Sequence, residues 1–189
     1  FDTGPGNALL DGWNRRHGKG EYDLDGKWAR SGRVDPPLLA RLLGHPYFSL
    51  APPKSTGREE FNLAWLDGHL SGRDVAYRDV QATLLAFTAT TIADAIRDNL
   101  PESGEIFVCG GGIHTACLME QLRARLEPRR IESTAAIGME PDWVEAGLFA
   151  WLARQALSGL PGNLPPATGA AHRVVLGAIH PGRSGPGSN

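Results

Sequence analysis

The sequence predicts an α/β fold in which helices outnumber strands. The first observation is the unit at 105–126, where the apolar run EIFVC precedes three consecutive glycines and an amphipathic helical pattern. The second is the region 74–99, the longest helical pattern, whose apolar residues recur at spacings of three and four. The third is a glycine turn at 1–7 that leads directly into a helical pattern. Ligands of open α/β sheets bind at the carboxyl ends of strands, so the first unit predicts a ligand site at its glycine turn.

Short helices between turns are expected in the first third of the chain. Four elements are predicted there: a helix at 7–16 with Asn7 as its N-cap, a polar surface excursion at 18–33, a helix opened by Asp35 with Pro36 and Pro37 and ending near Gly44, and a loop or extended stretch at 47–53.

Longer elements are expected in the remainder. These are a helix at 74–99 that Pro101 and Gly104 end, a strand at 105–109, a glycine turn at 110–112, a helix at 114–126 with Leu118, Leu122 and Leu126 inward, an edge strand at 130–132, a helix at 141–157 with Val144, Leu148, Trp151 and Leu152 on its buried face, and a strand at 174–179. Residues 182–189 are expected to be frayed.

Composition narrows the class of protein. Of the 189 residues, 41% are hydrophobic and 21% charged, as in a globular domain. The formal net charge of −2 argues against bulk binding to nucleic acid or to an anionic membrane surface. No apolar run approaches the ~18 residues of a membrane span. Cys109 and Cys117 do not form a disulfide framework and are expected to be buried, which favours a reducing, cytoplasmic compartment.

The opening motif DTGPGN predicts a phosphate site. Gly4 and Gly6 let the backbone approach a bulky anion, and the N-terminus of the following helix faces the same spot. A carboxylate beside phosphates repels them, so Asp2 is expected either to help hold Mg²⁺ or to remove a proton from a nucleophile. The alternative, that Asp2 only caps the turn, remains open.

A second motif, FVCGGGIHTACL, places three glycines between a strand and a helix. Gly110, Gly111 and Gly112 would leave a shelf free of side chains that can receive an adenine and a ribose. The motif is neither the dinucleotide fingerprint nor a P-loop. The alternatives are a simple tight turn for the glycines and a surface position for His114.

A third motif, PPKSTGREEFN at 52–62, gathers donors suited to a polar or carboxylated ligand, namely Lys54, Ser55, Thr56, Arg58 and Asn62. The alternative is structural. Thr56 and Glu59 have the spacing of a capping box, which predicts a helix over 56–66.

A fourth motif, PDWVEAGLFAWLA at 141–153, contains Glu145, a candidate second carboxylate. Asp142 and Glu145 stand three apart at a helix start. From the residues alone, Asp142 as N-cap with Glu145 reaching back to it is the favoured interpretation.

Taken in order, FDTGPGN, PPKSTGRE, VCGGG and PDWVEAGLFAWLA closely resemble the C-terminal half of the anhydro-N-acetylmuramic acid kinases, and the resemblance continues through VVLGAIHPG at 174–182. PPKSTGRE and PDWVEAGLFAWLA are specific to that family. The other two are shared with the sugar kinase, hexokinase, Hsp70 and actin superfamily. The implied fold is α/β, a ribonuclease-H-like lobe of the actin- and hexokinase-type ATPases with a mixed sheet flanked by helices.

The resemblance implies an enzyme that uses ATP, Mg²⁺ and water to open the 1,6-anhydro bond of anhydro-N-acetylmuramic acid and to phosphorylate O6, in the cytoplasmic recycling of peptidoglycan. It implies that Asp2 is the general base acting on the attacking water and that Glu145 is a carboxylate of the sugar site. The residues expected at the site are Asp2 as the base, Glu145, Lys54, Ser55 and Arg58 on the sugar, and Thr3, Gly4, Gly6, Asn7, Gly110, Gly111 and Gly112 on the nucleotide, with no dedicated metal ligand. Family members often have Asn where Thr115 and Ala116 follow His114, so nucleotide contacts by those two side chains are not carried over.

The expected organisation is one lobe at 1–182, with a loop-rich insertion at 18–57 on the substrate side and a disordered tail at 183–189. Because the resemblance covers only a C-terminal half, an N-terminal lobe with another phosphate motif is expected to be missing. The chain alone is therefore expected to be inactive. Its expected partners are the sugar, ATP and the missing lobe, and a homodimer remains possible. Binding to nucleic acid or to a membrane is not expected.

Two rival functions remain open. Another sugar or acid kinase of the superfamily would share the glycine motifs but not the stretch at 54–59. A non-catalytic, actin-like nucleotide-binding module would need no base beside the phosphates, so Asp2 argues against it.

Overall fold

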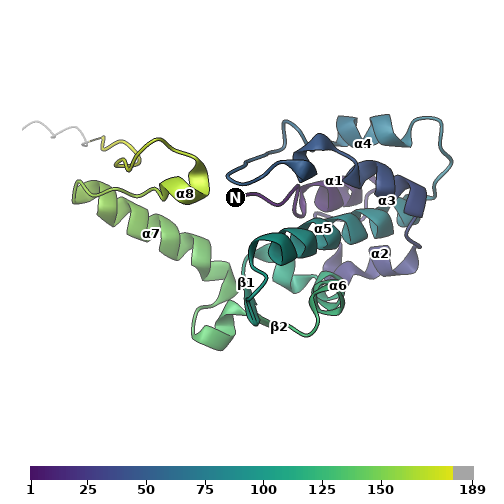
Figure 1. The fold of residues 1–189 in the computed structure, drawn as a ribbon. Coiled ribbons are helices and arrows are strands. Elements are labelled where there is room, and N and C mark those ends of the chain that lie inside the picture. Colours follow the sequence, from purple (N-terminus) through teal and green to yellow (C-terminus); the bar gives the residue numbers. More distant parts are fainter. Residues whose placement is uncertain (181–189) are drawn as a thin grey trace, which may run out of the picture.

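The computed structural model describes residues 1–180. Its body is built around one long helix, α5 (Tyr77–Asn99) (Figure 1). Every residue from Val80 to Ala89 is buried, so this part of α5 is enclosed on all sides rather than along one stripe. The elements packed against it are α1 (Ala8–Arg16), α2 (Lys27–Ser31), α3 (Pro36–Leu43) and α6 (Ala116–Leu126). The predicted helix at 74–99 is confirmed, with a start three residues later.

The sheet is small and lies beside α6. Strands β1 (Glu105–Val108) and β2 (Arg130–Ser133) pair in parallel, with Glu105 opposite Arg130 and Val108 opposite Ser133. Parallel strands need a crossover, and α6 supplies it with Leu118, Leu122 and Leu126 buried as predicted. Residues 1–180 therefore show an α/β unit with two parallel strands. They do not show the mixed sheet of a ribonuclease-H-like lobe.

An aromatic cluster holds the loop after α3 against α5. Its members are Tyr47 and Phe48 in the 3₁₀ turn η2 (Pro46–Ser49), Phe61, Trp65 in α4 (Leu63–Leu70), and Phe87 in α5. The Phe61 and Trp65 rings pack edge to face with their centroids 5.1 Å apart, and the Phe48 and Phe87 rings do so with centroids 5.4 Å apart. Such pairs add ~0.5–1.5 kcal/mol each beyond burial, which fixes the path of residues 46–62.

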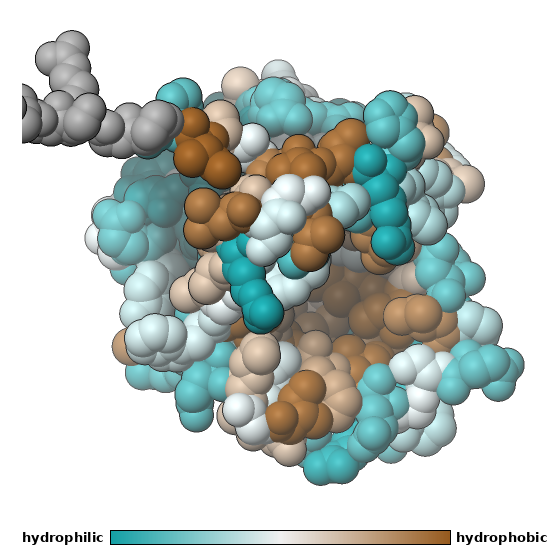
Figure 2. Space-filling model, turned by 90° about the vertical axis from the view of Figure 1, so that its left-hand side faces the viewer, coloured by the Kyte–Doolittle hydropathy of each residue, from teal (hydrophilic) through white to brown (hydrophobic). Residues whose placement is uncertain are grey.

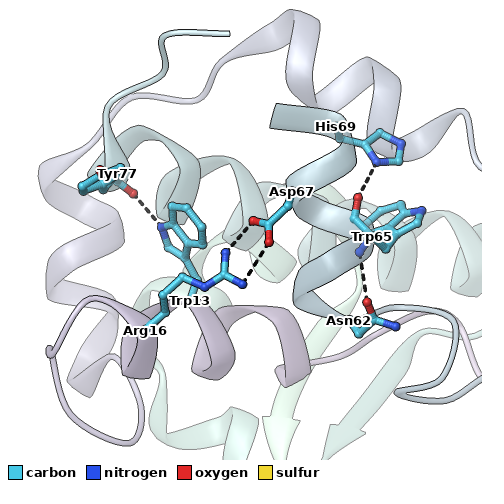
Figure 3. Close-up of polar contacts among 7 residues, drawn as sticks. All are labelled: Trp13, Arg16, Asn62, Trp65, Asp67, His69 and Tyr77. Atoms are coloured by element: carbon cyan, nitrogen blue, oxygen red, sulfur yellow. Dashed lines mark hydrogen bonds and ion pairs between the residues drawn. The ribbon is translucent and has the colours of Figure 1, made fainter. Parts of the chain in front are cut away.

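Polar contacts join α4 to the first helix (Figure 3). Arg16 binds the Asp67 carboxylate through both terminal nitrogens, with Nη2 3.1 Å from Oδ2. Trp13 Nε1 donates to the Tyr77 carbonyl oxygen at 2.9 Å. Together these contacts tie the helix that follows the opening turn to α4 and to the start of α5.

Residues 18–33 lie mostly at the surface, as predicted, but they also form helical turns that were not predicted. They contain the 3₁₀ turn η1 (Leu24–Gly26) and helix α2, with Ala29 buried. The Asp23 carboxylate accepts hydrogen bonds from the backbone N–H groups of Trp28 and Ala29 at 2.9 and 2.8 Å, and so caps the first turn of α2. A local polar cap, which hydrophobic periodicity does not register, makes this segment helical.

Helix starts agree with prediction only in part. Asp35 caps α3 by accepting from Leu38 N at 2.7 Å, as predicted, and α3 ends before Gly44. Asn7 stands at the N-cap position of α1 but makes no side-chain cap. The stretch at 47–53 begins inside η2 and then continues as loop.

The predicted helix at 56–66 is wrong. The helix begins later, at Leu63, where Asn62 Oδ1 accepts from Trp65 N at 2.9 Å (Figure 3). The Thr56 hydroxyl instead donates to the Glu60 carboxylate, so Thr56 and Glu59 form no capping box.

The segment after β2 forms an arm that projects from the helical body (Figure 1). Its elements are the 3₁₀ turns η4 (Thr134–Ile137) and η5 (Pro141–Trp143) and helices α7 (Val144–Leu157) and α8 (Pro165–Thr168). The predicted helix at 141–157 is present, but its predicted buried face is not, because no residue of α7 is buried. Leu148 and Trp151 are 51% and 46% exposed.

Other predictions are wrong or fall outside the described residues. Residues 174–179 form no strand. Cys109 is exposed rather than buried, whereas Cys117 is buried as predicted. The frayed tail predicted at 182–189 and the disordered tail at 183–189 lie outside the described residues. Among the described helices, none combines the length and the hydropathy needed to cross a bilayer.

Candidate functional site

The Asp2 carboxylate is held by the segment that carries the third motif. Its Oδ2 accepts hydrogen bonds from the Ser55 hydroxyl at 2.6 Å and from Thr56 N at 3.1 Å. The backbone of Asp2 is fixed as well, because its N–H donates to the Lys54 carbonyl oxygen at 3.3 Å and its own carbonyl accepts from the Tyr47 hydroxyl at 2.6 Å. The carboxylate thus turns toward residues 55–56 rather than capping its own turn.

These donors keep Asp2 ionised. The Ser55 hydroxyl is the main cause that lowers the pKa of the Asp2 carboxyl, and the Thr56 N–H acts in the same direction against partial burial. Both donors bind Oδ2, and within residues 1–180 no hydrogen bond reaches Oδ1, so that oxygen is left to accept a proton.

Glycine is required where the opening turn bends. Gly6 has φ +54°, in the left-handed region, and its carbonyl accepts from the Thr88 hydroxyl at 2.8 Å. A Cβ on Gly4 would come within 3.1 Å of Phe48 Cε1 and 3.3 Å of Thr91 Oγ1. Close packing on α5 and the aromatic cluster therefore shapes the turn, which leads at once into the N-terminus of α1.

A cavity of about 370 Å³ opens beside this turn. The residues that line it are Asp2, Gly4, Pro5, Asn7, Ala8, Asp11, Thr56, Gly57, Arg58 and Phe61. Within residues 1–180, Arg58 has no carboxylate at ion-pair distance, so its guanidinium can take an anion in this cavity. The structure thus brings together a carboxylate, a glycine turn, a helix N-terminus and a cation.

Asp11 is a candidate that the motifs missed. It lines the same cavity as Asp2 and also a small gap shared with Asn7 and Thr115. Burial raises the pKa of its carboxyl, while Arg15 and Arg58 act in the opposite direction. The signal was available in the sequence, because Asn7 and Asp11 are four apart on one helix and share a face.

The second glycine turn lies against the first. Gly110 has φ +76° and begins η3 (Gly111–His114), and a Cβ on Gly112 would lie 3.6 Å from Asn7 Nδ2. Apart from the adjoining residues of the chain, no described atom lies within 4 Å of the position that a Cβ would take on Gly110 or Gly111, so open space faces both. Asn7 therefore stands between the two turns that were predicted to bind nucleotide.

Two predicted residues face a different cavity. Thr3 and Lys54 line a space of about 440 Å³ together with Phe1, Phe48, Asp94 and Asp98, among others. Lys54 Nζ donates to the Tyr47 carbonyl oxygen at 3.2 Å and lies 4.8 Å from the centre of the Tyr47 ring. Lys54 and Arg58 are thus separated by the segment of chain that binds Asp2.

Glu145 is exposed in the first turn of α7. Within residues 1–180, no hydrogen bond or ion pair joins it to Asp2 or to residues 54–58. The capping interpretation of this motif is wrong, because α7 has no side-chain cap and Asp142 lies 2.8 and 3.1 Å from His114 Nε2 through its two oxygens.

The donor set fits a magnesium–nucleotide complex rather than a bound metal alone. Residues 1–180 contain no group of three or more His, Cys, Asp or Glu side chains placed to hold a metal. Asp2 and Asp11 supply two carboxylates to one cavity. Mg²⁺ usually takes one or two protein carboxylates and completes its shell with water and phosphate oxygens, which is what these residues permit.

Comparisons with known proteins identify the family of this chain. The family model described as "Anhydro-N-acetylmuramic acid kinase" matches residues 1–182. Proteins of that name from Nitrosomonas europaea and Thiobacillus denitrificans are 54% and 51% identical over 181 and 183 residues, each alignment covering 96% of this chain. One from Shewanella oneidensis is 52% identical over 178 residues, or 94% of this chain. The aligned regions are 50%, 49% and 48% of those proteins, so the chain spans about half the length of the curated relatives it matches. The chain belongs to the anhydro-N-acetylmuramic acid kinase family.

Proposed function

We propose that the full-length protein is an ATP-dependent kinase that hydrolytically opens 1,6-anhydro-N-acetylmuramic acid and phosphorylates O6 to give N-acetylmuramic acid 6-phosphate. The observation that carries the proposal is the Asp2 carboxylate, held ionised by Ser55 and Thr56 beside two adjoining glycine turns. A protein that only binds nucleotide has no use for a base there. The relatives named as anhydro-N-acetylmuramic acid kinases support the choice of substrate.

In the proposed reaction Asp2 removes a proton from a water molecule as that water attacks C1 of the sugar. The C1–O6 bond breaks, and O6 takes the γ-phosphoryl group of ATP. The proton ends on Asp2, the hydroxyl on C1, and ADP leaves. A glycosidase needs a second carboxyl to protonate its leaving oxygen, whereas here the phosphoryl group captures that oxygen, so one base suffices.

The remaining residues bind and orient. Backbone N–H groups of the turn at Gly4–Gly6 and the start of α1 would face the phosphates, and the open surface at Gly110 and Gly111 would receive the adenosine. Asp11 and Asp2, which line the cavity, would supply carboxylates to Mg²⁺, and the ion would neutralise charge on the phosphate oxygens. Arg58, Ser55, Lys54 and Glu145 would orient the sugar.

We further propose that the part of the full-length protein outside this chain covers the arm and completes the site. The exposed apolar side chains of the arm include Trp143, Leu148, Phe149, Trp151 and Leu157. From the side of α7 and α8, Figure 2 shows hydrophobic surface around a hollow. A patch of this kind marks an interaction surface, and the relatives are long enough to supply a second lobe. The 189-residue chain alone would then be inactive, and a homodimer is the competing occupant of the surface.

The test uses the full-length protein with ATP, Mg²⁺ and the anhydro-sugar in ¹⁸O-labelled water. We expect ADP and sugar phosphate in equal amounts, with the label on C1 and none in the phosphate. N-acetylmuramic acid without the anhydro bond is the matched sugar control, and its phosphorylation at an equal rate would favour an ordinary sugar kinase. Nucleotide binding without ADP release would favour a non-catalytic module. Turnover by the 189-residue chain alone would contradict the two-lobe proposal. The cytoplasm is the expected compartment, because ATP is there.

A further inference from the structure

Two contacts join the second glycine turn to the start of the arm. Gly110 N donates to the Pro141 carbonyl oxygen at 3.1 Å. His114, the last residue of η3, places its Nε2 2.8 Å from Asp142 Oδ1 and 3.1 Å from Oδ2. One contact lies at each end of the turn, and both partners lie in η5, directly before α7.

This junction fixes the direction of α7. The helix buries no residue against the body, and its main contact is with η5. Glu145 follows Asp142 by three residues, so a rotation of η5 moves the Glu145 carboxylate directly. Neither His114 nor Asp142 lines the cavity beside Asp2, and neither is needed for the proposed chemistry.

We propose that His114 and Asp142 form a positioning pair that couples nucleotide bound at Gly110–Gly112 to the placement of Glu145 in the sugar site. The inference rests on the proposed function, because it needs nucleotide at this turn and sugar near Glu145. A nucleotide that orders η3 also orders η5 through the pair, and thereby the first turn of α7. Linkage requires the reverse as well: sugar held by Glu145 tightens nucleotide binding by the same factor.

The experiment measures that factor in the full-length protein. The affinity for the anhydro-sugar is determined by calorimetry with and without a non-hydrolysable ATP analogue and Mg²⁺, and the ratio of the two affinities is the coupling. We expect His114→Ala and Asp142→Ala each to reduce the coupling by about two- to fivefold, the range available to an exposed side-chain pair. The double variant should lose no more than either single variant, because residues that act as one unit are not additive.

A matched control pair is available in the body. Arg30 Nη2 lies 2.8 Å from Glu120 Oε2, and the two side chains are each 54% exposed, against 55% and 61% for His114 and Asp142. Arg30→Ala and Glu120→Ala should leave the coupling unchanged. His114→Gln keeps a donor for Asp142 and should retain most of the coupling, which also protects the test if an alanine variant folds poorly.

The outcomes separate the two proposals. A wild-type protein that neither binds nor turns over the anhydro-sugar contradicts the proposed function. A wild-type protein that turns it over with no coupling, or pair variants that behave like the controls, contradict the positioning pair. Additive losses in the double variant also overturn it, because they show that the two residues act separately.

Discussion

The substitution Asp2→Asn removes the basic carboxylate of Asp2 but keeps a side chain of nearly the same shape. Asparagine keeps an oxygen that can accept from the Ser55 hydroxyl and Thr56 N, which lie 2.6 and 3.1 Å from the carboxylate in the wild type. The turn should therefore stay in place while the base is lost. Removal of a general base costs ~10²–10⁴ in rate, which corresponds to roughly 3–5 kcal/mol in the activation barrier.

The assay is ADP release by the full-length protein with saturating anhydro-sugar, paired with calorimetry of nucleotide binding. Nucleotide affinity should stay close to that of the wild type, because Asp11 still supplies a carboxylate for Mg²⁺ and the lost charge at Asp2 no longer repels the phosphates. Asp67→Asn is the matched control, since Asp67 pairs with Arg16 outside the cavity and its loss should leave the rate unchanged. An Asp2→Asn protein within a few-fold of the wild-type rate would remove Asp2 from the mechanism. An equal loss in Asp67→Asn would show that the effect is not specific to Asp2.

Other substitutions test the pKa of Asp2, the second glycine turn and the packing of the body. Ser55→Ala removes the main cause of the lowered pKa of Asp2, so we expect that pKa to rise. The acidic limb of the plot of kcat/KM against pH should then move to higher pH, and an unmoved limb would mean that another group sets it. Gly111→Val puts a branched side chain into open space, so we expect the affinity for nucleotide to fall more than that for sugar by calorimetry, whereas equal losses would make the turn purely structural. Gly32→Ala would place a Cβ 2.1 Å from the Arg78 carbonyl oxygen and should lower the free energy of unfolding by ~1–3 kcal/mol in chemical denaturation. Gly68→Ala, in α4 with no described neighbour within 4 Å, should raise it by ~0.5–1 kcal/mol, and a Gly32→Ala protein as stable as this control would contradict the packing of that turn.

The sequence predicted best those elements whose formation depends on neighbours along the chain. The long helix α5, strand β1, the glycine turn and the buried leucines of α6 were all found where periodicity placed them. The Asp35 cap was found because a cap lies within three residues of its partner.

The predictions were wrong where a contact with a distant residue, or a competing local contact, determines the structure. Thr56 has the spacing of a capping box, yet its backbone is engaged by Asp2, more than fifty residues away, and its hydroxyl by Glu60. Helix α7 has the pattern of a buried helix, but nothing within residues 1–180 covers it. A pattern tells which face is apolar, and only tertiary structure tells what lies against that face.

The candidate site was predicted from motif types and was incomplete for the same reason. Asp2, Gly4, Asn7 and Arg58 line one cavity, as the motifs suggested. The division of Lys54 and Arg58 between two cavities follows from the path of residues 54–58. Asp11 belongs to no motif. Its spacing of four from Asn7 could be read from the sequence, but the structure was needed to show that this face of α1 lines the cavity.

The uneven distribution of tryptophan gives the protein an optical reporter of its own. Trp13, Trp28 and Trp65 lie in or against the core of the body, whereas Trp143 and Trp151 are exposed on the arm. Indole emission moves to shorter wavelength when the ring leaves water. The Trp13 ring also lies 4.3 Å from the His17 imidazole, a neighbour that can quench its fluorescence. The long-wavelength part of the emission therefore arises from the arm. Covering α7, by another part of the protein or by a second copy, would shift the spectrum without any added label.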